Sequence, residues 1–145
     1  MIRILTRLGE LDTEELLRYC EDPWYKVPDV AYEAVVERAG ADQDLLKSLL
    51  VRINKGLPPY KSSTAVNLLT KLLTLPAETL TAVETDLLAL TSSDVQAIRK
   101  VIISSLTAEW VTYEAAYRLA SEAIHDPSPA VRNTATEVLR LLHRD

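Results

Sequence analysis

Residue types that metal sites and catalytic sites depend on are scarce in this chain of 145 residues. It has one cysteine (Cys20), two histidines (His125 and His143) and three glycines that never cluster. A single cysteine cannot form an internal disulfide, and no cysteine or histidine pair has the spacing of zinc ligands. There is no glycine-rich phosphate loop, and no Gly-x-Ser-x-Gly motif that would mark a nucleophilic serine. The sequence therefore predicts a protein that is not an enzyme and has no cofactor and no metal.

Long apolar runs are also missing. No stretch of about 20 apolar residues occurs, so we expect no transmembrane helix and no membrane partner. Residues 1–7 lack the apolar core and the small-residue cleavage site of a signal peptide. The single cysteine fits a reducing compartment. Together these features predict a cytoplasmic location.

Positive charge is absent from one long stretch of an acidic chain. The net charge is −5, and no Lys or Arg lies between Lys71 and Arg99, where four acidic residues fall: Glu78, Glu84, Asp86 and Asp94. Proteins that bind duplex nucleic acid usually carry a basic stripe, so a nucleic-acid partner is disfavoured. The acid-only stretch 72–98 would suit a small acidic inhibitor, of the immunity or antitoxin type, that covers a basic partner.

What the chain does contain is apolar residues at helical spacing, separated by short breaks rich in proline, glycine or polar residues. No hairpin dipeptide joins alternating segments, so we expect an all-α fold. Pairing the helices in order gives one domain of four hairpins, with a leading segment at 1–9. The expected hairpins span about 12–39, 42–75, 77–106 and 108–143.

Capping residues predict where these helices begin and end. Asp12 and Asp42 are expected to cap the helices that follow them, and Thr107 is expected to cap a helix over 108–124. Gly40 is expected to end the helix that starts near Pro28. Two serines, Ser92 and Ser93, are expected to cap the helix that follows them, and the apolar spacing after Pro76 predicts one continuous helix to about Leu90.

The last helix carries the most specific pattern. It begins Asp126-Pro127-Ser128-Pro129-Ala130-Val131-Arg132 and continues as an amphipathic helix. A tight proline turn followed by a Val-Arg pair resembles the second helix of a HEAT repeat. Asp22-Pro23 and Ile98-Arg99 fall at matching positions in the first and third hairpins.

The resemblance implies a short right-handed α-solenoid of about four HEAT-like helical hairpins, and a compact helical bundle is the alternative. It also implies that Arg132 and Arg99 belong to a ladder of Asp and Arg side chains between repeats, which is a structural role.

An α-solenoid usually holds another protein, so the resemblance implies a non-catalytic interaction module or scaffold. Its partner is expected on the polar faces of the second helices, which carry Glu33, Glu37, Asn67, Lys71, Gln96, Lys100, Asn133, Glu137 and Arg140. Their mixed charges favour a protein over a polyanion. By resemblance, a DNA-repair protein and a lyase-type enzyme subunit are further alternatives, although no residue points to either.

Aromatic residues offer two more candidate contacts. Trp24 and Tyr25 lie in a loop between two prolines, where they either fold back over the core or contact a partner. Trp110, Tyr113 and Tyr117 share a narrow arc of the helix expected over 108–124. Such a stripe favours packing on a neighbouring repeat, and an exposed contact surface is the alternative.

Overall fold

The computed structural model describes residues 12–24 and 26–143 of the chain, and every regular element in that part is helical. The expected leading segment 1–9 lies outside the described residues. The all-α prediction is confirmed. The elements are α2 (Thr13–Tyr19), α3 (Val27–Ala41), α4 (Gln43–Asn54), α5 (Ser62–Leu72), α6 (Ala77–Thr81), α7 (Glu84–Leu88), the 3-10 helix η1 (Ala89–Ser92), α8 (Gln96–Ser104), α9 (Tyr113–Ala123) and α10 (Pro129–Leu142).

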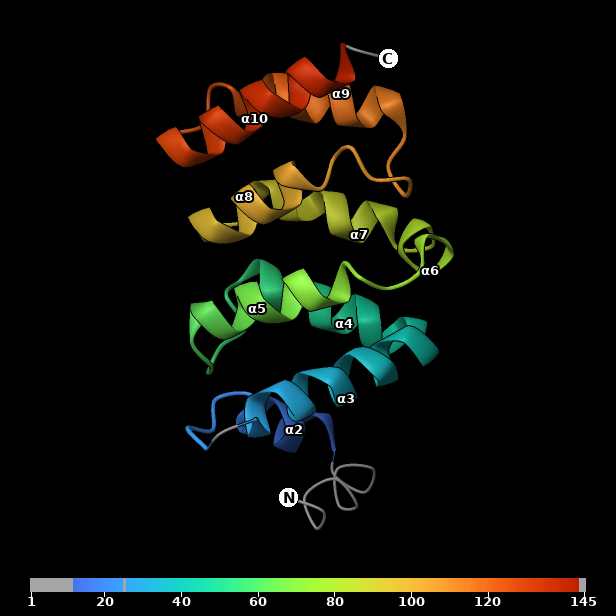
Figure 1. Ribbon diagram of the computed structural model, residues 1–145, viewed down its shortest axis with the longest axis vertical. Helices are drawn as coiled ribbons and strands as arrows, with labels where there is room; N and C mark the ends of the chain where they lie inside the picture. Colours follow the sequence, from blue (N-terminus) through green and yellow to red (C-terminus); the bar gives the residue numbers. More distant parts are fainter. Residues whose placement is uncertain (1–11, 25, 144–145) are drawn as a thin grey trace.

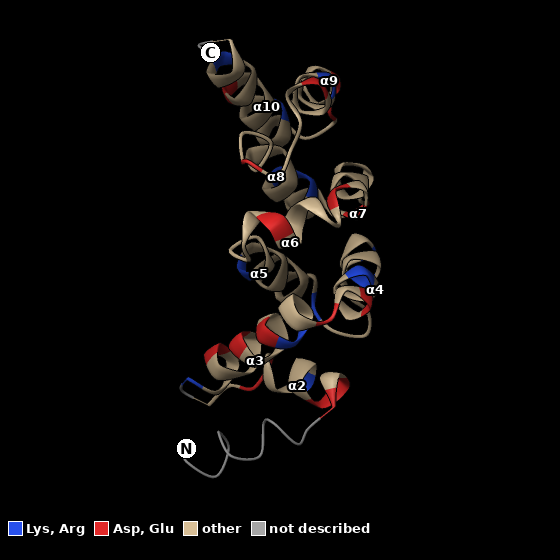
Figure 2. Ribbon diagram, turned by 90° about the vertical axis from the view of Figure 1, so that its right-hand side faces the viewer, with Lys and Arg blue, Asp and Glu red and all other residues tan. Residues whose placement is uncertain are grey.

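The helices stack in pairs along the long axis of the molecule (Figure 1). Seen from the side, α3, α5, α8 and α10 form one layer and α2, α4, α7 and α9 form the other (Figure 2). Within the first layer, α3 packs against α5, α5 against α8, and α8 against α10. Helices of one pair also pack on each other, as α2 does on α3 and α9 on α10. The main contacts of each pair are therefore internal or with the next pair.

One apolar core runs through the whole stack. In α4 the buried residues Leu46, Leu49, Leu50 and Ile53 have the i, i+3, i+4, i+7 spacing of a single helix face. Buried residues on similar faces of the other helices pack with these four residues in one hydrophobic cluster, which extends from Leu16 to Leu142. Because no single pair could bury such faces alone, stacking is what gives this chain a core.

The caps predicted at Asp12 and Asp42 are present. The side chain of Asp12 accepts a hydrogen bond from the amide of Glu15 at 2.8 Å, and Asp42 accepts one from Leu45 at 3.2 Å. At the last helix, Ser128 is the N-cap and Pro129 occupies the first turn, where its missing N–H costs nothing.

Two predicted helix starts are wrong. The helix expected after Ser92 and Ser93 begins only at Gln96. The buried Ser93 hydroxyl donates to the carbonyl of Asn54 at 2.7 Å and accepts from the amide of Val95 at 3.1 Å, which holds the chain in a turn before the helix. The helix expected from Thr107 begins at Tyr113, with Thr112 as its N-cap. Tertiary contacts thus hold both segments in turns that the apolar spacing alone does not show.

The single helix expected after Pro76 is also wrong, since the chain forms α6, α7 and η1 there. Threonine and valine alternate with other residues over 79–85, and β-branched side chains lower helix propensity. Gly40 does not end a helix, because α3 continues to Ala41. A Cβ atom on Gly40 would lie 2.9 Å from Leu75 Cδ2, so the glycine lets α3 approach that segment closely.

Candidate functional site

The residues expected to contact a partner lie on the four helices of one layer. They comprise Glu33 and Glu37 of α3, Asn67 and Lys71 of α5, Gln96 and Lys100 of α8, and Asn133, Glu137 and Arg140 of α10. All are exposed except Lys71, which is half-buried. We call this set the second-helix face. It presents polar side chains from successive helices along the length of the stack.

The N-terminal end of the second-helix face is acidic. Glu33 and Glu37 follow Asp29 at intervals of four residues, and all three are exposed. They form a red row along α3 in Figure 2. Like charges at this spacing repel each other by a few tenths of a kcal/mol, roughly 0.2–0.5 per pair. A positively charged group bound beside this row would relieve the repulsion, so the row favours a basic partner. Sequence reasoning missed Asp29, although its spacing from Glu33 identifies it.

On α5 the face is partly used to hold the stack together. The Lys71 ammonium nitrogen lies 5.6 Å from the centre of the Tyr32 ring on α3, a cation–π contact. Burial raises the pKa of Tyr32, and a hydrogen bond with Asn67 opposes that change. Lys71 and Asn67 thus join α5 to α3, which leaves them less available to a partner than the residues on α3.

On α10 the face continues into an apolar hollow. Arg140 Nε donates to Glu137 Oε2 at 3.0 Å, so these two charges neutralise each other locally. Asn133 and Glu137 line a hollow of ≈ 330 Å³ together with Val138 and Leu141. The C-terminal end of the layer is therefore less charged and more apolar than the N-terminal end.

Trp24 lies in the loop between α2 and α3 and is exposed to solvent. Its side chain is 75% exposed, so the interpretation that it folds back over the core is wrong. Its amide donates to Asp22 Oδ1 at 2.8 Å, which fixes the loop just before the indole. Tyr25 lies outside the described residues. A tryptophan held in this way offers apolar area beside the first turn of α3.

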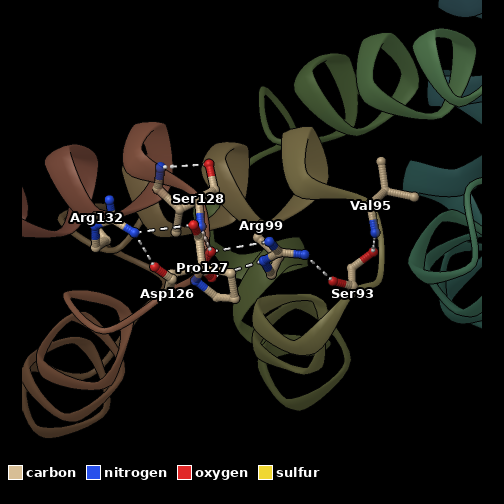
Figure 3. A network of polar contacts seen from close by, with 8 residues as sticks. Ser93, Val95, Arg99, Asp126, Pro127, Ser128 and Arg132 are labelled. Carbon is tan, nitrogen blue, oxygen red and sulfur yellow. Dashed lines mark hydrogen bonds and ion pairs between the residues drawn. The ribbon is translucent and has the colours of Figure 1, made fainter.

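A polar network joins the third helix pair to the fourth (Figure 3). Arg99 of α8 donates to Asp126 Oδ2 at 2.9 Å and to Oδ1 at 3.1 Å, a bidentate ion pair whose side chains are 16% and 11% exposed. Arg99 also donates to the carbonyl of Ser93 at 2.9 Å. Burial raises the pKa of Asp126, but the hydrogen bonds from Arg99 and Ser128 outweigh it and hold that pKa below its ordinary value.

Arg132 lies in the same network but contacts only its own turn. Its Nη1 donates to the carbonyls of Asp126 and Pro127 at 2.8 and 3.1 Å. Arg99 is therefore the residue of the expected ladder that crosses between helix pairs, and Arg132 closes the turn. In the same turn, Asp126 Oδ1 accepts a hydrogen bond from the amide of Ser128 at 2.8 Å. Asp22 Oδ1 accepts one from the amide of Trp24, also two residues later, at the same distance.

Carboxylates also join the earlier helix pairs. Glu21 Oε2, after α2, accepts from the amide of Lys61 and the hydroxyl of Thr64, both at 2.7 Å, and these bonds lower its pKa. Glu84 of α7 accepts from the amide of Thr112 at 3.1 Å. In each case an acid from one pair satisfies an amide at the start of a helix in the next.

A third carboxylate contact ties α2 to α4. Arg52 forms an ion pair with Glu14, and the Tyr60 hydroxyl donates to Glu14 Oε2 at 2.8 Å. Hydrogen bonds from Arg52 and Tyr60 hold the pKa of Glu14 below its ordinary value. The carboxylates with lowered pKa values are thus ionised groups that connect helices.

At the C-terminal end, two aromatic residues are exposed where sequence reasoning favoured packing. Tyr113 and Tyr117 are 56% and 41% exposed, and their rings stack with centroids 6.3 Å apart. The packing interpretation is therefore wrong for these two residues. Trp110 is buried, but it precedes α9 and does not share a helix with them.

The groups that could perform chemistry are few in the part of the chain that the structure describes. Burial raises the pKa of the Cys20 thiol to about 12, so it stays protonated and is a poor nucleophile. Over residues 12–24 and 26–143, no group of three His, Cys, Asp or Glu side chains is arranged to hold a metal ion. Among the same residues, no helix is long and apolar enough to span a bilayer.

No protein-family model, no curated protein and no solved structure matches the chain. The function is therefore inferred from the chain's own residues and their geometry.

Proposed function

We propose that the chain is a short right-handed α-solenoid of about four HEAT-like hairpins that binds another protein and has no catalytic activity of its own. Two observations support the solenoid. The helix pairs stack in two layers with their main contacts to the next pair (Figures 1 and 2). The turns at Asp22 and Asp126 have the same side-chain to amide hydrogen bond.

The observation that carries the binding role is the second-helix face. It is a continuous layer with exposed polar residues on α3, α5, α8 and α10. Stacked helical repeats create such extended surfaces, which suit a protein partner. The acidic row on α3 lies at one end of this face, and the exposed Trp24 lies just before α3 in the chain. A partner that is basic where it meets α3 fits these charges.

The non-catalytic part of the proposal is supported by how the perturbed groups are used. Glu14, Glu21 and Asp126 have lowered pKa values because they accept hydrogen bonds from other helices or from turns. General acid–base catalysis usually needs a carboxyl group whose pKa is raised toward neutrality. The buried Cys20 thiol fits a reducing compartment, and we place the protein in the cytoplasm.

The acidic-inhibitor alternative belongs to the same class of protein binders. The row on α3 favours it, but that row lies outside the stretch 72–98, from which sequence reasoning derived the idea. Within 72–98, the Glu84 carboxylate already accepts a hydrogen bond from the amide of Thr112, so it is partly used inside the molecule. The α3 row is therefore the better candidate for a surface that covers a basic partner.

Charge reversal tests the proposed face. The tagged chain is used to capture partners from a lysate at low and moderate salt, and the capture is repeated with the double variant Glu33→Lys/Glu37→Lys. We expect the wild-type chain to retain a stoichiometric protein at moderate salt, and the variant to lose it without a lower melting temperature. Because both residues are exposed, the substitutions leave the core intact.

The matched control is Glu114→Lys/Glu122→Lys on α9, which makes the same charge change on exposed residues of the other layer. This control should retain the partner. Equal retention by the two variants would contradict the assignment of the face. Capture of nucleic acid that is released steeply by salt would contradict the whole proposal.

A further inference from the structure

The charged contacts between successive helix pairs are not evenly distributed along the stack. The first pair is joined to the second by the ion pair of Glu14 with Arg52 and by the two hydrogen bonds that Glu21 accepts. The third pair is joined to the fourth by the two hydrogen bonds from Arg99 to Asp126. Charged groups paired in a fixed geometry are strong and directional, so they limit how far these helices can move past each other.

The junction between the second pair (α4 and α5) and the third (α7 and α8) is built differently. At this junction α5 packs against α8, and α4 packs against α7 and η1 (Figure 1). Among the described residues, no ion pair and no cation–π contact crosses it. Buried apolar residues on both sides, such as Leu69 and Ile98, belong to the common core. Because apolar contacts have no preferred direction, helices joined by them alone can turn or slide with little loss of contact.

The polar contact that does cross this junction lies where the end of α4 meets the segment before α8. It is the neutral hydrogen bond from the Ser93 hydroxyl to the carbonyl of Asn54, at 2.7 Å. Beside it, a Cβ atom on Gly56 would lie 3.3 Å from Val95 Cγ2, so the two segments approach closely. The chain itself crosses the junction once, through residues 73–76 between α5 and α6. A few residues at the ends of elements are what a hinge between two packed bodies requires.

We propose that this junction is a hinge, about which two halves of the stack rotate as separate bodies. The first half is residues 12–24 and 26–73, the second is 76–143, and each half is held together by its own charged contacts. The hinge divides the second-helix face, with Glu33 and Glu37 on one half and Asn133 and Glu137 on the other. A partner that contacts both halves therefore sets the angle between them, a consequence that rests on the proposed function.

Distances between pairs of spin labels, measured by pulsed electron paramagnetic resonance on the chain alone, test the hinge. The native Cys20 is buried and burial raises its pKa to about 12, so introduced cysteines are labelled first. Cysteines are introduced two at a time at exposed positions of one layer: Glu37→Cys on α3, Thr70→Cys on α5, Lys100→Cys on α8 and Asn133→Cys on α10. Labels at 70 and 100 span the hinge. Labels at 37 and 70, and at 100 and 133, span the two junctions with charged contacts and are the matched controls.

We expect the distance distribution across the hinge to be at least about twice as broad as that of either control. Arg99→Ala removes the charged contact between the third and fourth pairs, so it should broaden the distribution between labels at 100 and 133. Asp126→Asn, which removes the charge and keeps the side-chain size, is a second variant in case Arg99→Ala does not fold.

Equal breadth at the three junctions of the wild-type chain would overturn the proposal. So would a distribution between labels at 100 and 133 that neither Arg99→Ala nor Asp126→Asn broadens, since charged contacts would then not be what holds a junction rigid. Because the chain is measured alone, either result is independent of whether the second-helix face binds a partner.

Discussion

Asp126 shows how a single side chain can fix the relation of two helix pairs. It lies in the connection between α9 and α10, where its side chain accepts a hydrogen bond from the amide of Ser128 and two more from Arg99 of the preceding pair. In the part of the chain described, every buried side-chain nitrogen or oxygen has a hydrogen-bond partner. Removing one member of the Arg99–Asp126 pair therefore leaves the other charge half-desolvated and unpaired, which is costly.

We predict that Arg99→Ala lowers the free energy of unfolding by about 3 kcal/mol, as is typical when a mostly buried ion pair loses one partner. Urea unfolding followed by circular dichroism measures it. The control is Arg118→Ala, whose ion pair with Glu122 on α9 is exposed and 3.8 Å long, and whose loss should cost no more than about 0.5 kcal/mol. Equal effects of the two substitutions would show that the Arg99 contact does not hold the pairs together.

At the scale of the helix, the position where a helix begins depends on its own capping residue and also on side chains from other helix pairs. The helices after Asp12, Asp42 and Ser128 carry their own capping side chains. The N-cap of α5, Lys61, makes no side-chain capping bond, and Glu21 accepts from its amide instead. The position of α5 is thus tied to the end of α2, about 40 residues earlier, as the separation in the hydrogen bond shows.

We predict that Glu21→Ala destabilises the protein by about 1 kcal/mol, the usual cost of losing a helix cap. Hydrogen exchange at the amide of Lys61 should accelerate at the same time, because its acceptor is lost. Asp29→Ala serves as control, since Asp29 is an exposed acid in the first turn of α3 whose removal costs only a few tenths of a kcal/mol, about 0.3–1 at most. Unchanged exchange at Lys61 would contradict this role of Glu21.

At the scale of the whole molecule, carboxylates link the first helix pair to the second and the third pair to the fourth. Glu14 of α2 forms an ion pair with Arg52 of α4, and Glu21 accepts a hydrogen bond from the amide at the N-cap of α5. Glu84 accepts one from the amide at the N-cap of α9, and Asp126 forms an ion pair with Arg99 of α8. The pKa values of Glu14, Glu21 and Asp126 are lower in the folded chain than their ordinary values. The stability of the stack should therefore depend on pH in the acid range.

We predict that the melting temperature is steady near neutral pH and falls as the pH drops below about 5. In that window the unfolded chain binds more protons than the folded chain, because its carboxyl pKa values are higher, so acid favours unfolding. Calorimetric scans between neutral pH and about pH 3 measure it. Asp126→Asn should reduce the slope, and a wild-type melting temperature that does not change over this range would contradict the prediction.

The sequence by itself determined the helical fold, the main capping residues and the proline turn before α10, because helical periodicity, capping and turn chemistry act over a few neighbouring residues. It also placed nine of the candidate binding residues on one layer of helices. Only the tertiary structure decided where α8 and α9 begin, that the segment after Pro76 breaks into short helices, and that Trp24, Tyr113 and Tyr117 are exposed. These features depend on which helix packs against which, as the buried hydroxyl of Ser93 and the ion pair of Arg99 with Asp126 show. Contacts between residues about 30–40 positions apart leave no local pattern, so they follow from the packed chain alone.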